Sequence, residues 1–553
     1  MKYLEMKKRA FMSIVNKVKG FIREVSGTPP LTLPDCVDED SLVGYTLSGE
    51  CYQDVTPTPE APIEVESVGD KTENLMMYPY NATAGIKNGV TFTDNGDGTI
   101  TVDGTASETA NASFGLMQMK NITDKTKKYY LTGCPAGSNA SKAILIAFYY
   151  EGKYKSEKYE TGKGLLLDLS SYDFDFDQIN FSIIIAKKQT VDNWVFKPML
   201  VEGDAPKEFE PYNKYKIPVI ASGKNYFNLE TYTKLIGNGG GDRTSFVTIQ
   251  DGIIQNQYDI YYEGAYFLTE EPFELSAGTY IISGKVNKWR RNSISVGFRF
   301  DNSVTTNIRN SVYLPDYADE WYEFSTKITI AQPMTIIGVY LQDNGATANN
   351  FKSTIEFKEI QIEKANSVTD YEPYVEPKTT NIYLDEPLRK IVDYADYIDF
   401  EKQKVVRNIG NALLSATALS GSSENNEMLG LYGRVTDKKS INDMYSVQVL
   451  SPNLLGVARY YYNTDIPCIT AHVTGTVVYF KLPKALLDAE TAAAANRYFN
   501  ANPTTVYYIK DTPTETDIVL PKLPTFKGTT VYSADTKINP SNMSATYYST
   551  YKE

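Results

Sequence analysis

The sequence repeats one signature, first as Phe196-Lys-Pro-Met-Leu-Val-Glu-Gly-Asp-Ala-Pro-Lys-Glu-Phe-Glu-Pro-Tyr212 and later as Phe357-Lys-Glu-Ile-Gln-Ile-Glu-Lys-Ala-Asn-Ser-Val-Thr-Asp-Tyr-Glu-Pro-Tyr374. Each copy reads as a closing β-strand, a polar loop and an aromatic-Glu-Pro-Tyr segment. Phe196 and Phe357 are 161 residues apart, and Pro211 and Pro373 are 162 apart. A repeat of this length is a domain and not a small solenoid unit.

The two copies also match near their starts. Asn74-Leu75 corresponds to Asn225-Tyr226, and Tyr129 to Gly133 corresponds to Tyr280 to Gly284, both at a spacing of 151 residues. The change from 151 to 161 indicates that the second copy gained about ten residues in its middle. Many short strands with turn signals between them, and no helical pattern, predict two tandem antiparallel β-sandwiches.

Within the first copy, Val90–Val102 predicts a β-hairpin because two alternating strands flank the turn residues Asp94–Gly98. This turn also resembles part of a calcium loop, but it lacks the later acidic ligand of an EF-hand, so a turn without metal is expected. Further strands are expected in the two copies at Lys128–Thr132, Ala143–Tyr150, Ile179–Ala186, Trp194–Glu202, Thr279–Lys285, Ser293–Phe300 and Thr354–Glu363.

The whole sequence predicts a mainly β protein in five parts. The C-terminal part should be mostly β with one helix at Lys484–Asn500, a stretch of strong helix formers near Pro483. The predicted parts are an N-terminal helix for assembly or docking (1–30), an extended anchor and linker (31–71), sandwich 1 (72–213), sandwich 2 (214–376) and a β-rich C-terminal domain (377–553).

The N-terminal segment carries a heptad-like seam of Phe11, Val15, Val18, Ile22 and Val25. Residues 1–25 hold seven Lys or Arg and two Glu. Three interpretations remain open: a short coiled coil, a docking peptide for another protein, or a helix on a membrane surface. The two protein contacts are favoured. We expect a homo-oligomer, with a trimer as the first guess.

The composition excludes several functions. A net charge of −13 over 553 residues disfavours nucleic acid as a partner, and His472 is the single histidine. No apolar run is long enough for a transmembrane helix, and no secretory signal is recognisable. No nucleophile elbow, metal-ligand spacing, phosphate loop or nucleotide fingerprint occurs. We therefore expect no catalytic residues, no metal, no cofactor and no enzyme activity.

Three groups of motifs together form a recognisable set. They are Gln53-Asp-Val-Thr-Pro-Thr-Pro-Glu-Ala-Pro62 with Val68-Gly-Asp70, the two Glu-Pro-Tyr copies, and Phe526-Lys-Gly with Ile538-Asn-Pro-Ser-Asn-Met543. From about residue 31 onward the chain resembles tail, baseplate and minor structural proteins of phages that infect gut Firmicutes. The two sandwiches are similar to the jelly-roll carbohydrate-binding modules of phage tail appendages. The resemblance implies a protein on the tail or capsid surface of a virion that contacts other virion proteins and a host cell-surface glycan.

A glycan-binding sandwich uses aromatic faces to stack on sugar rings and polar side chains to bond the hydroxyls. The candidate carbohydrate-binding residues are Trp289, Arg290, Trp321, Tyr322, Tyr149 and Tyr150. Ordinary packing is the competing explanation for each aromatic residue, and it is preferred for Trp194 and for the tyrosines of the Glu-Pro-Tyr segments. We expect the binding surface on the variable stretches between the matched strands.

Three functions therefore compete. The favoured one is a tail-fibre, baseplate or receptor-binding appendage that attaches to host glycan. The second is a capsid head fibre or decoration protein with a mainly structural role. The third is a polysaccharide depolymerase, which is disfavoured because the chain lacks the long β-helix usual in depolymerase tailspikes.

Overall fold

The computed structural model describes residues 46–548, apart from 54–55, 64, 81–83, 119–125, 237–246, 259–265, 288–292, 302–306, 316–319, 344–352, 416–417, 420–426, 462–465 and 535–546. The described chain is mainly β and its strands pair almost entirely antiparallel, which confirms the predicted fold class. The described residues divide into two compact units: residues 69–217 with 383–387, and residues 46–68, 218–382 and 388–548. The predicted N-terminal helix and its seam lie outside the described residues.

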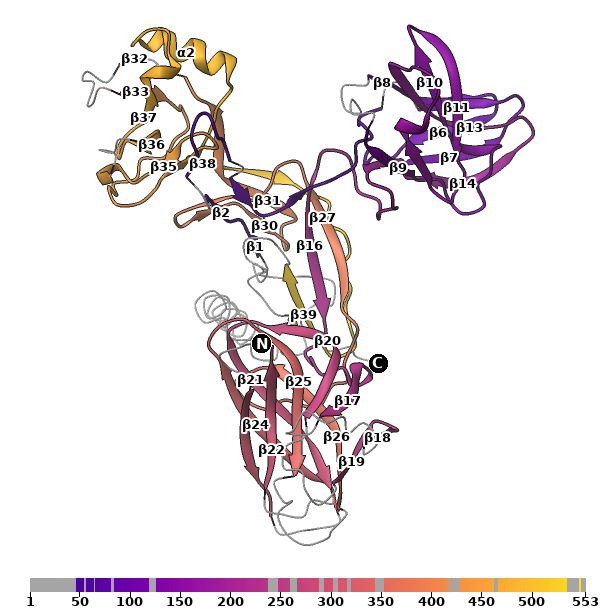
Figure 1. The fold of residues 1–553 in the computed structure, drawn as a ribbon, viewed down its shortest axis with the longest axis vertical. Coiled ribbons are helices and arrows are strands. Elements are labelled where there is room, and N and C mark those ends of the chain that lie inside the picture. The colour runs from indigo at the N-terminus through magenta and orange to yellow at the C-terminus, as the bar shows by residue number, and fades with distance from the viewer. Residues whose placement is uncertain are drawn as a thin grey trace, which may run out of the picture. The chain divides into compact units, whose positions relative to one another are not determined.

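The first sandwich consists of β5 to β15, the group of purple strands labelled β6 to β14 in Figure 1. One layer is the sheet β11-β10-β13-β8, and the other comprises the sheets β12-β9-β15 and β14-β7-β6-β5. The bounds are β5 Gly85–Lys87, β6 Val90–Asp94, β7 Ile100–Thr105, β8 Ala110–Gln118, β9 Lys128–Thr132, β10 Lys142–Tyr150, β11 Lys153–Glu160, β12 Leu165–Asp168, β13 Gln178–Ile185, β14 Thr190–Phe196 and β15 Met199–Glu202.

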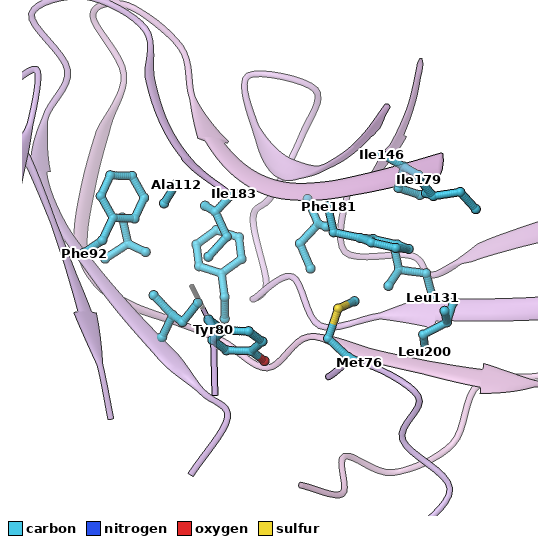
Figure 2. Packing of buried hydrophobic residues seen from close by; sticks show 14 of the residues in the cluster. Met76, Tyr80, Phe92, Ala112, Leu131, Ile146, Ile179, Phe181, Ile183 and Leu200 are labelled. Carbon is cyan, nitrogen blue, oxygen red and sulfur yellow. The ribbon is translucent and has the colours of Figure 1, made fainter. Parts of the chain in front are cut away.

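The alternation of apolar and polar residues along the sequence explains these strands. In β6, Val90 and Phe92 are buried while Thr91 and Thr93 are exposed, so one face meets the core and the other meets water. The predicted hairpin is β6–β7, and Asp94 Oδ1 accepts a hydrogen bond from Gly96 N at 2.9 Å in its turn. Figure 2 shows the core between the layers. Phe92 and Ala112 lie at one end, Met76, Leu131 and Leu200 at the other, and Phe181 and Ile183 between them.

The second sandwich consists of β17 to β26 and repeats this topology (Figure 1). The strands β20-β25-β22-β23 correspond in this order to β8-β13-β10-β11, and β17 is added beside β20. The sheet β18-β19-β26-β21-β24 forms the other layer. The bounds are β17 Tyr232–Ile236, β18 Val247–Gln250, β19 Ile253–Tyr258, β20 Tyr266–Leu275, β21 Gly278–Asn287, β22 Ser293–Phe300, β23 Asn307–Tyr313, β24 Tyr322–Ile330, β25 Met334–Asp343 and β26 Ser353–Lys364.

A buried asparagine joins the start of each sandwich to its closing signature. Asn225 donates from Nδ2 to the carbonyl oxygens of Ile360 (3.1 Å) and Glu372 (3.0 Å), and its Oδ1 accepts from the amides of Phe227 (2.9 Å) and Ile362 (3.0 Å).

Asn74 makes the corresponding four bonds in the first sandwich. It donates to the carbonyl oxygens of Pro198 (3.2 Å) and Glu210 (2.8 Å) and accepts from the amides of Met76 (2.9 Å) and Leu200 (3.2 Å). The signature therefore closes each sandwich onto its own first segment.

The closing strands of the two sandwiches differ by one inserted residue. In the first sandwich the strand is interrupted at Lys197–Pro198, because proline has no N–H to donate to a sheet. The expectation of one continuous strand at Trp194–Glu202 is therefore wrong for this copy. In the second sandwich β26 stays continuous, and Glu359 forms a bulge at a positive φ of 53° opposite Gly284. Glu359 is the inserted residue, and it explains why the spacing between the copies is 161 residues at Phe196 and Phe357 but 162 residues at Pro211 and Pro373.

The remaining strands form further sheets. Within the larger unit, Val219–Ser222 of β16 (Tyr215–Ser222) pairs with β39 (Thr529–Ala534), and within the smaller unit Tyr215–Lys216 pairs with β4 (Asp70–Lys71). The β30–β31 hairpin and β38 belong to the sheet β1-β30-β31-β38-β34, and a second sheet is β32-β33-β37-β36-β35. Their bounds are β1 Thr46–Ser48, β30 Tyr397–Asp399, β31 Lys404–Leu413, β32 Ala418–Leu419, β33 Met428–Arg434, β34 Val449–Leu450, β35 Leu455–Gly456, β36 Cys468–Ala471, β37 Val477–Pro483 and β38 Thr505–Asp517.

The helix of the C-terminal part is shorter than the predicted Lys484–Asn500. Lys484–Leu486 is a 3₁₀ turn, and α2 spans Ala492–Ala501. The α-helix begins here because Thr491 caps it, its Oγ1 accepting from Ala494 N at 3.2 Å. Phe499 of α2 packs on Phe480 of β37, and this contact anchors the helix to the sheet.

Candidate functional site

The candidate site is the outer face of the sheet β11-β10-β13-β8 in the first sandwich. Along β10, Ile144, Ile146 and Phe148 point into the core, so Leu145, Ala147 and Tyr149 point outward. The register then identifies the outward side chains on the neighbouring strands. Tyr149 is paired with Tyr154 of β11 and Gln178 of β13, and Ala147 is paired with Glu157 and Asn180.

A bulge in β11 brings two tyrosines to this face. Tyr154 and Tyr159 are five residues apart, so in a regular strand they would lie on opposite faces. Ser156 pairs with Phe148 whereas Tyr154 pairs with Tyr149, which leaves Lys155 as an extra residue. The phase of the strand shifts there, and both tyrosines face outward.

The face combines aromatic rings with polar groups. The rings of Tyr149 and Tyr154 meet edge to face, with centroids 6.1 Å apart, and Tyr154 is 54% exposed. Tyr159 Oη donates to Glu157 Oε1 at 2.8 Å, and this hydrogen bond, more than burial, raises the pKa of Tyr159 to about 12. Gln178 and Asn180 are half-buried between these rings and β8.

This arrangement suits a ligand with apolar faces and many hydroxyl groups. Tyrosine rings offer large, rigid apolar contacts, and carboxylate and amide groups accept and donate hydrogen bonds at their margins. Because the elements form an open sheet face, a chain-like ligand can lie along the rows of side chains.

The structure places only some of the predicted carbohydrate-binding residues on the candidate face. Tyr149 lies on the candidate face, whereas Tyr150 points to the opposite side of β10, where Lys155 Nζ lies 5.5 Å from its ring centroid. Trp289 and Arg290 lie outside the described residues, as do the seam residues Phe11 to Val25.

Trp321 and Tyr322 belong to the second sandwich, at the start of β24. Lys358 Nζ lies 4.2 Å from the centroid of a Trp321 ring, and the side chain of Trp321 is half-buried. Tyr322 is 41% exposed. Trp194, expected to be structural, packs against the core of the first sandwich under Lys142, whose Nζ lies 4.4 Å from its ring.

Sequence reasoning missed Tyr154, Tyr159, Glu157, Gln178 and Asn180. The alternating polar and aromatic stretch Lys153–Glu160 was a signal for an exposed edge strand. The sequence did not reveal the bulge at Lys155, and without it the two tyrosines belong to different faces.

Two other kinds of feature are absent from the described residues. No group of three or more His, Cys, Asp or Glu side chains is placed to hold a metal ion within the described ranges. No helix in that part of the chain has the length and apolar character needed to cross a membrane.

The fold and this face define a mainly β protein with two sandwiches of equivalent topology. No protein-family model matches the chain, and no curated protein matches it.

Three solved structures are similar to the chain at low identity. The tandem CBM22-1–CBM22-2 domain of Xyn10C from Paenibacillus barcinonensis is 9% identical, with 54% of this chain and 98% of that chain covered and a TM-score of 0.18. Truncated AlyQ, with CBM32 and alginate lyase domains, is 8% identical, covers 52% and 98%, and has a TM-score of 0.17. The T13 viral particle of IBDV is 13% identical, covers 66% and 83%, and has a TM-score of 0.12. TM-scores this low carry no information about function.

Proposed function

We propose that the first sandwich binds a glycan on the outer face of β10, β11 and β13. The observation that supports this most is the gathering of Tyr149, Tyr154 and Tyr159 on one face, together with Glu157, Gln178 and Asn180. The rings stack on the apolar faces of sugar rings, and the polar side chains bond the hydroxyls.

The face suits an oligosaccharide better than a single sugar. Rows of paired residues on neighbouring strands repeat about every 6.6–7 Å along a strand. The row of Tyr149 and Tyr154 is separated from the row of Tyr159 by the row that holds Ala147 and Glu157. Contacts spread over these rows need a ligand of several sugar units.

The wider proposal is that the chain is a virion appendage, in a tail fibre, baseplate or receptor-binding protein, that attaches to glycans of the host surface. Its support is the resemblance of the motifs around Gln53–Pro62, the Glu-Pro-Tyr copies and the C-terminal stretch to phage tail proteins. A glycan-binding face on one sandwich fits such a role. The competing proposal is a capsid head fibre whose sandwiches act as spacers.

A glycan array probed with the full-length chain tests the binding proposal. We expect the chain to retain bacterial cell-surface polysaccharides, and Tyr154→Ala to weaken retention about tenfold, because truncation of a central aromatic contact costs more than about 1 kcal/mol. Tyr445→Ala removes an exposed tyrosine of the C-terminal part and serves as the control. If the intact chain binds no glycan and no host cell, the proposal is wrong.

Antibody labelling of intact particles in the electron microscope tests the virion proposal separately. Label on the tail tip or baseplate supports an attachment appendage, and label on the capsid supports the head fibre. A chain absent from purified particles contradicts both.

A further inference from the structure

A pocket of about 360 Å³ opens in the second sandwich, beside its closing signature. Its volume falls in the range of small-molecule sites. Four segments of the chain build it: the turn after Phe227, the β18–β19 hairpin, the bulge in β26 and the segment that follows β26. Phe227, Ile254 and Ile360 are the buried apolar residues among its lining.

The bulge in β26 brings a carboxylate to the pocket. Glu359 is the residue that the second copy has and the first copy lacks, and it lines the pocket beside Ile360. Lys285 Nζ lies 2.7 Å from Glu359 Oε2, and both side chains are about one-third exposed. The ion pair thus holds Glu359 in place at the edge of the site.

Two tyrosines of the closing signature line the other side. Tyr371 is 45% exposed, and Tyr374 Oη donates to Glu376 Oε2 at 3.2 Å. The sequence favoured simple packing for Tyr374. The structure adds to this a position on the wall of the pocket.

Three carboxylates belong to the lining of the pocket, and one of them, Glu359, is paired with Lys285. The three are Glu230, Glu359 and Glu376, and no Lys or Arg occurs among the described residues of the lining. Burial and the charge of Glu376 raise the pKa of Tyr374 to about 12, and burial and the charge of Glu359 raise that of Tyr371. Both phenols therefore experience the field of the carboxylates.

Comparison of the two sandwiches shows that the acidic residues of the pocket occur in the second copy only. By the spacing of the repeat, Asn228 corresponds to Met77, Glu230 to Pro79 and Glu376 to Lys214, and Glu359 has no counterpart. The buried asparagine that shapes both copies is shared. The acidic side chains of the pocket therefore are not required to close a sandwich.

We propose that this pocket binds an organic ammonium group, held against the rings of Tyr371 and Tyr374 with Glu376 as its counter-charge. Aromatic faces attract cations through their quadrupole, and the attraction grows when the cation is desolvated. The apolar floor accommodates the carbon atoms next to the nitrogen. The site belongs to the second sandwich and is separate from the glycan face proposed above.

The ammonium group could belong to an amino sugar or to a choline-like headgroup, and titration of the full-length chain distinguishes these sources. Calorimetry with glucosamine, choline chloride and glucose provides three arms. Binding of glucosamine alone assigns an amino sugar, binding of choline alone assigns an alkylammonium ligand, and binding of both assigns the ammonium group itself. Glucose bound as tightly as glucosamine, or no binding of either ammonium probe, overturns the proposal.

Variants of the wall locate the bound probe. We expect Glu376→Gln to weaken ammonium binding about fivefold and Tyr371→Ala about tenfold, with thermal unfolding unchanged because both side chains are exposed. Glu515→Gln, at an exposed carboxylate paired with Lys404, is the matched control. Tyr149→Ala should leave ammonium binding intact, so the ammonium proposal and the glycan proposal can be overturned independently of each other. Unchanged affinity in both wall variants overturns the assignment.

Discussion

At the scale of single residues, the buried asparagines carry the closure of the sandwiches. Asn225 is 3% exposed and makes four hydrogen bonds to backbone groups. Asn225→Ala leaves those groups unpaired in the core, at a cost of about 2–4 kcal/mol. We expect the Ile362 amide to lose protection by roughly two orders of magnitude in hydrogen exchange.

Asn310→Ala is the control for this substitution. Asn310 donates to Thr326 Oγ1 and to the Lys327 carbonyl, both at 2.9 Å, but it is exposed to water. Its loss should cost less than about 1 kcal/mol. Equal effects of the two substitutions would show that burial of the amide contributes nothing.

Tyr374 should titrate at unusually high pH. Burial and Glu376 raise its pKa to about 12, above the ordinary value of 10. Because the folded state keeps the proton longer than the unfolded chain does, this contribution to stability is complete below pH 10 and is lost as the pH rises toward 12. The absorbance difference at alkaline pH between the native chain and Tyr374→Phe measures the midpoint. A midpoint near 10, unaffected by Glu376→Gln, would contradict this account.

Individual site residues were predictable only where a local pattern determined their direction. Tyr149 follows a run of alternating core positions, so its outward direction follows from Phe148. Tyr150 was grouped with it because sequence proximity does not separate the two faces of a strand. The bulge at Lys155 depends on how β11 pairs with its hairpin neighbour β10, and the bulge at Glu359 depends on pairing with the distant strand β21, so single-residue spacing in the sequence does not show them.

At the scale of elements, the second Glu-Pro-Tyr segment holds the C-terminal strand. Glu372 Oε2 accepts from Thr529 N at 2.7 Å and its Oε1 from Thr529 Oγ1 at 2.8 Å, and Lys224 Nζ lies 3.0 Å away. A side chain on Gly528 would clash, since its Cβ would lie 2.6 Å from Glu372 Oε2. Glu372 thus ties the second sandwich to the start of β39.

Glu372→Ala should release β39 from this contact. We expect faster hydrogen exchange and earlier proteolysis across Thr529–Ala534, because two hydrogen bonds and an ion pair are lost together. Glu210→Ala, at the equivalent position of the first sandwich, is the matched control. If both variants leave β39 equally protected, the contact does not hold the strand.

The sequence predicted most of the elements that repeat. The β6–β7 hairpin and β9, β10, β13, β21 and β26 follow from alternation and turn residues. The break between β14 and β15 is caused by Pro198. It was not predicted because the pattern shared by the two signatures indicates one continuous strand. The late start of α2 is set by the cap at Thr491, which outweighed the helix propensity of the residues before it.

At the scale of the whole molecule, the duplication was evident from spacing alone. The two copies share topology and a buried asparagine, while the pocket residues Glu230, Glu359 and Glu376 occur in one copy only. Spacing reveals the shared framework because closing a sandwich constrains it. Binding residues follow no such constraint, which is why most of the candidate face was not predicted.

Assembly is a prediction that rests on the sequence of residues 1–30. Light scattering of the full-length chain should give about three times its mass of 61.9 kDa. A chain without residues 1–30 should be monomeric, because the seam of Phe11 to Val25 is then missing. A monomer in both measurements would remove the prediction.

The central claim is that the outer face of β10, β11 and β13 binds glycan, and one comparison tests it most directly. Calorimetric titration of the full-length chain with its best-retained polysaccharide is repeated for Tyr149→Ala and Tyr150→Ala, neighbours on opposite sides of β10. The account predicts that Tyr149→Ala raises Kd about tenfold, corresponding to about 1.4 kcal/mol, and that Tyr150→Ala changes it less than about twofold. Equal losses, or a larger loss in Tyr150→Ala, would contradict it.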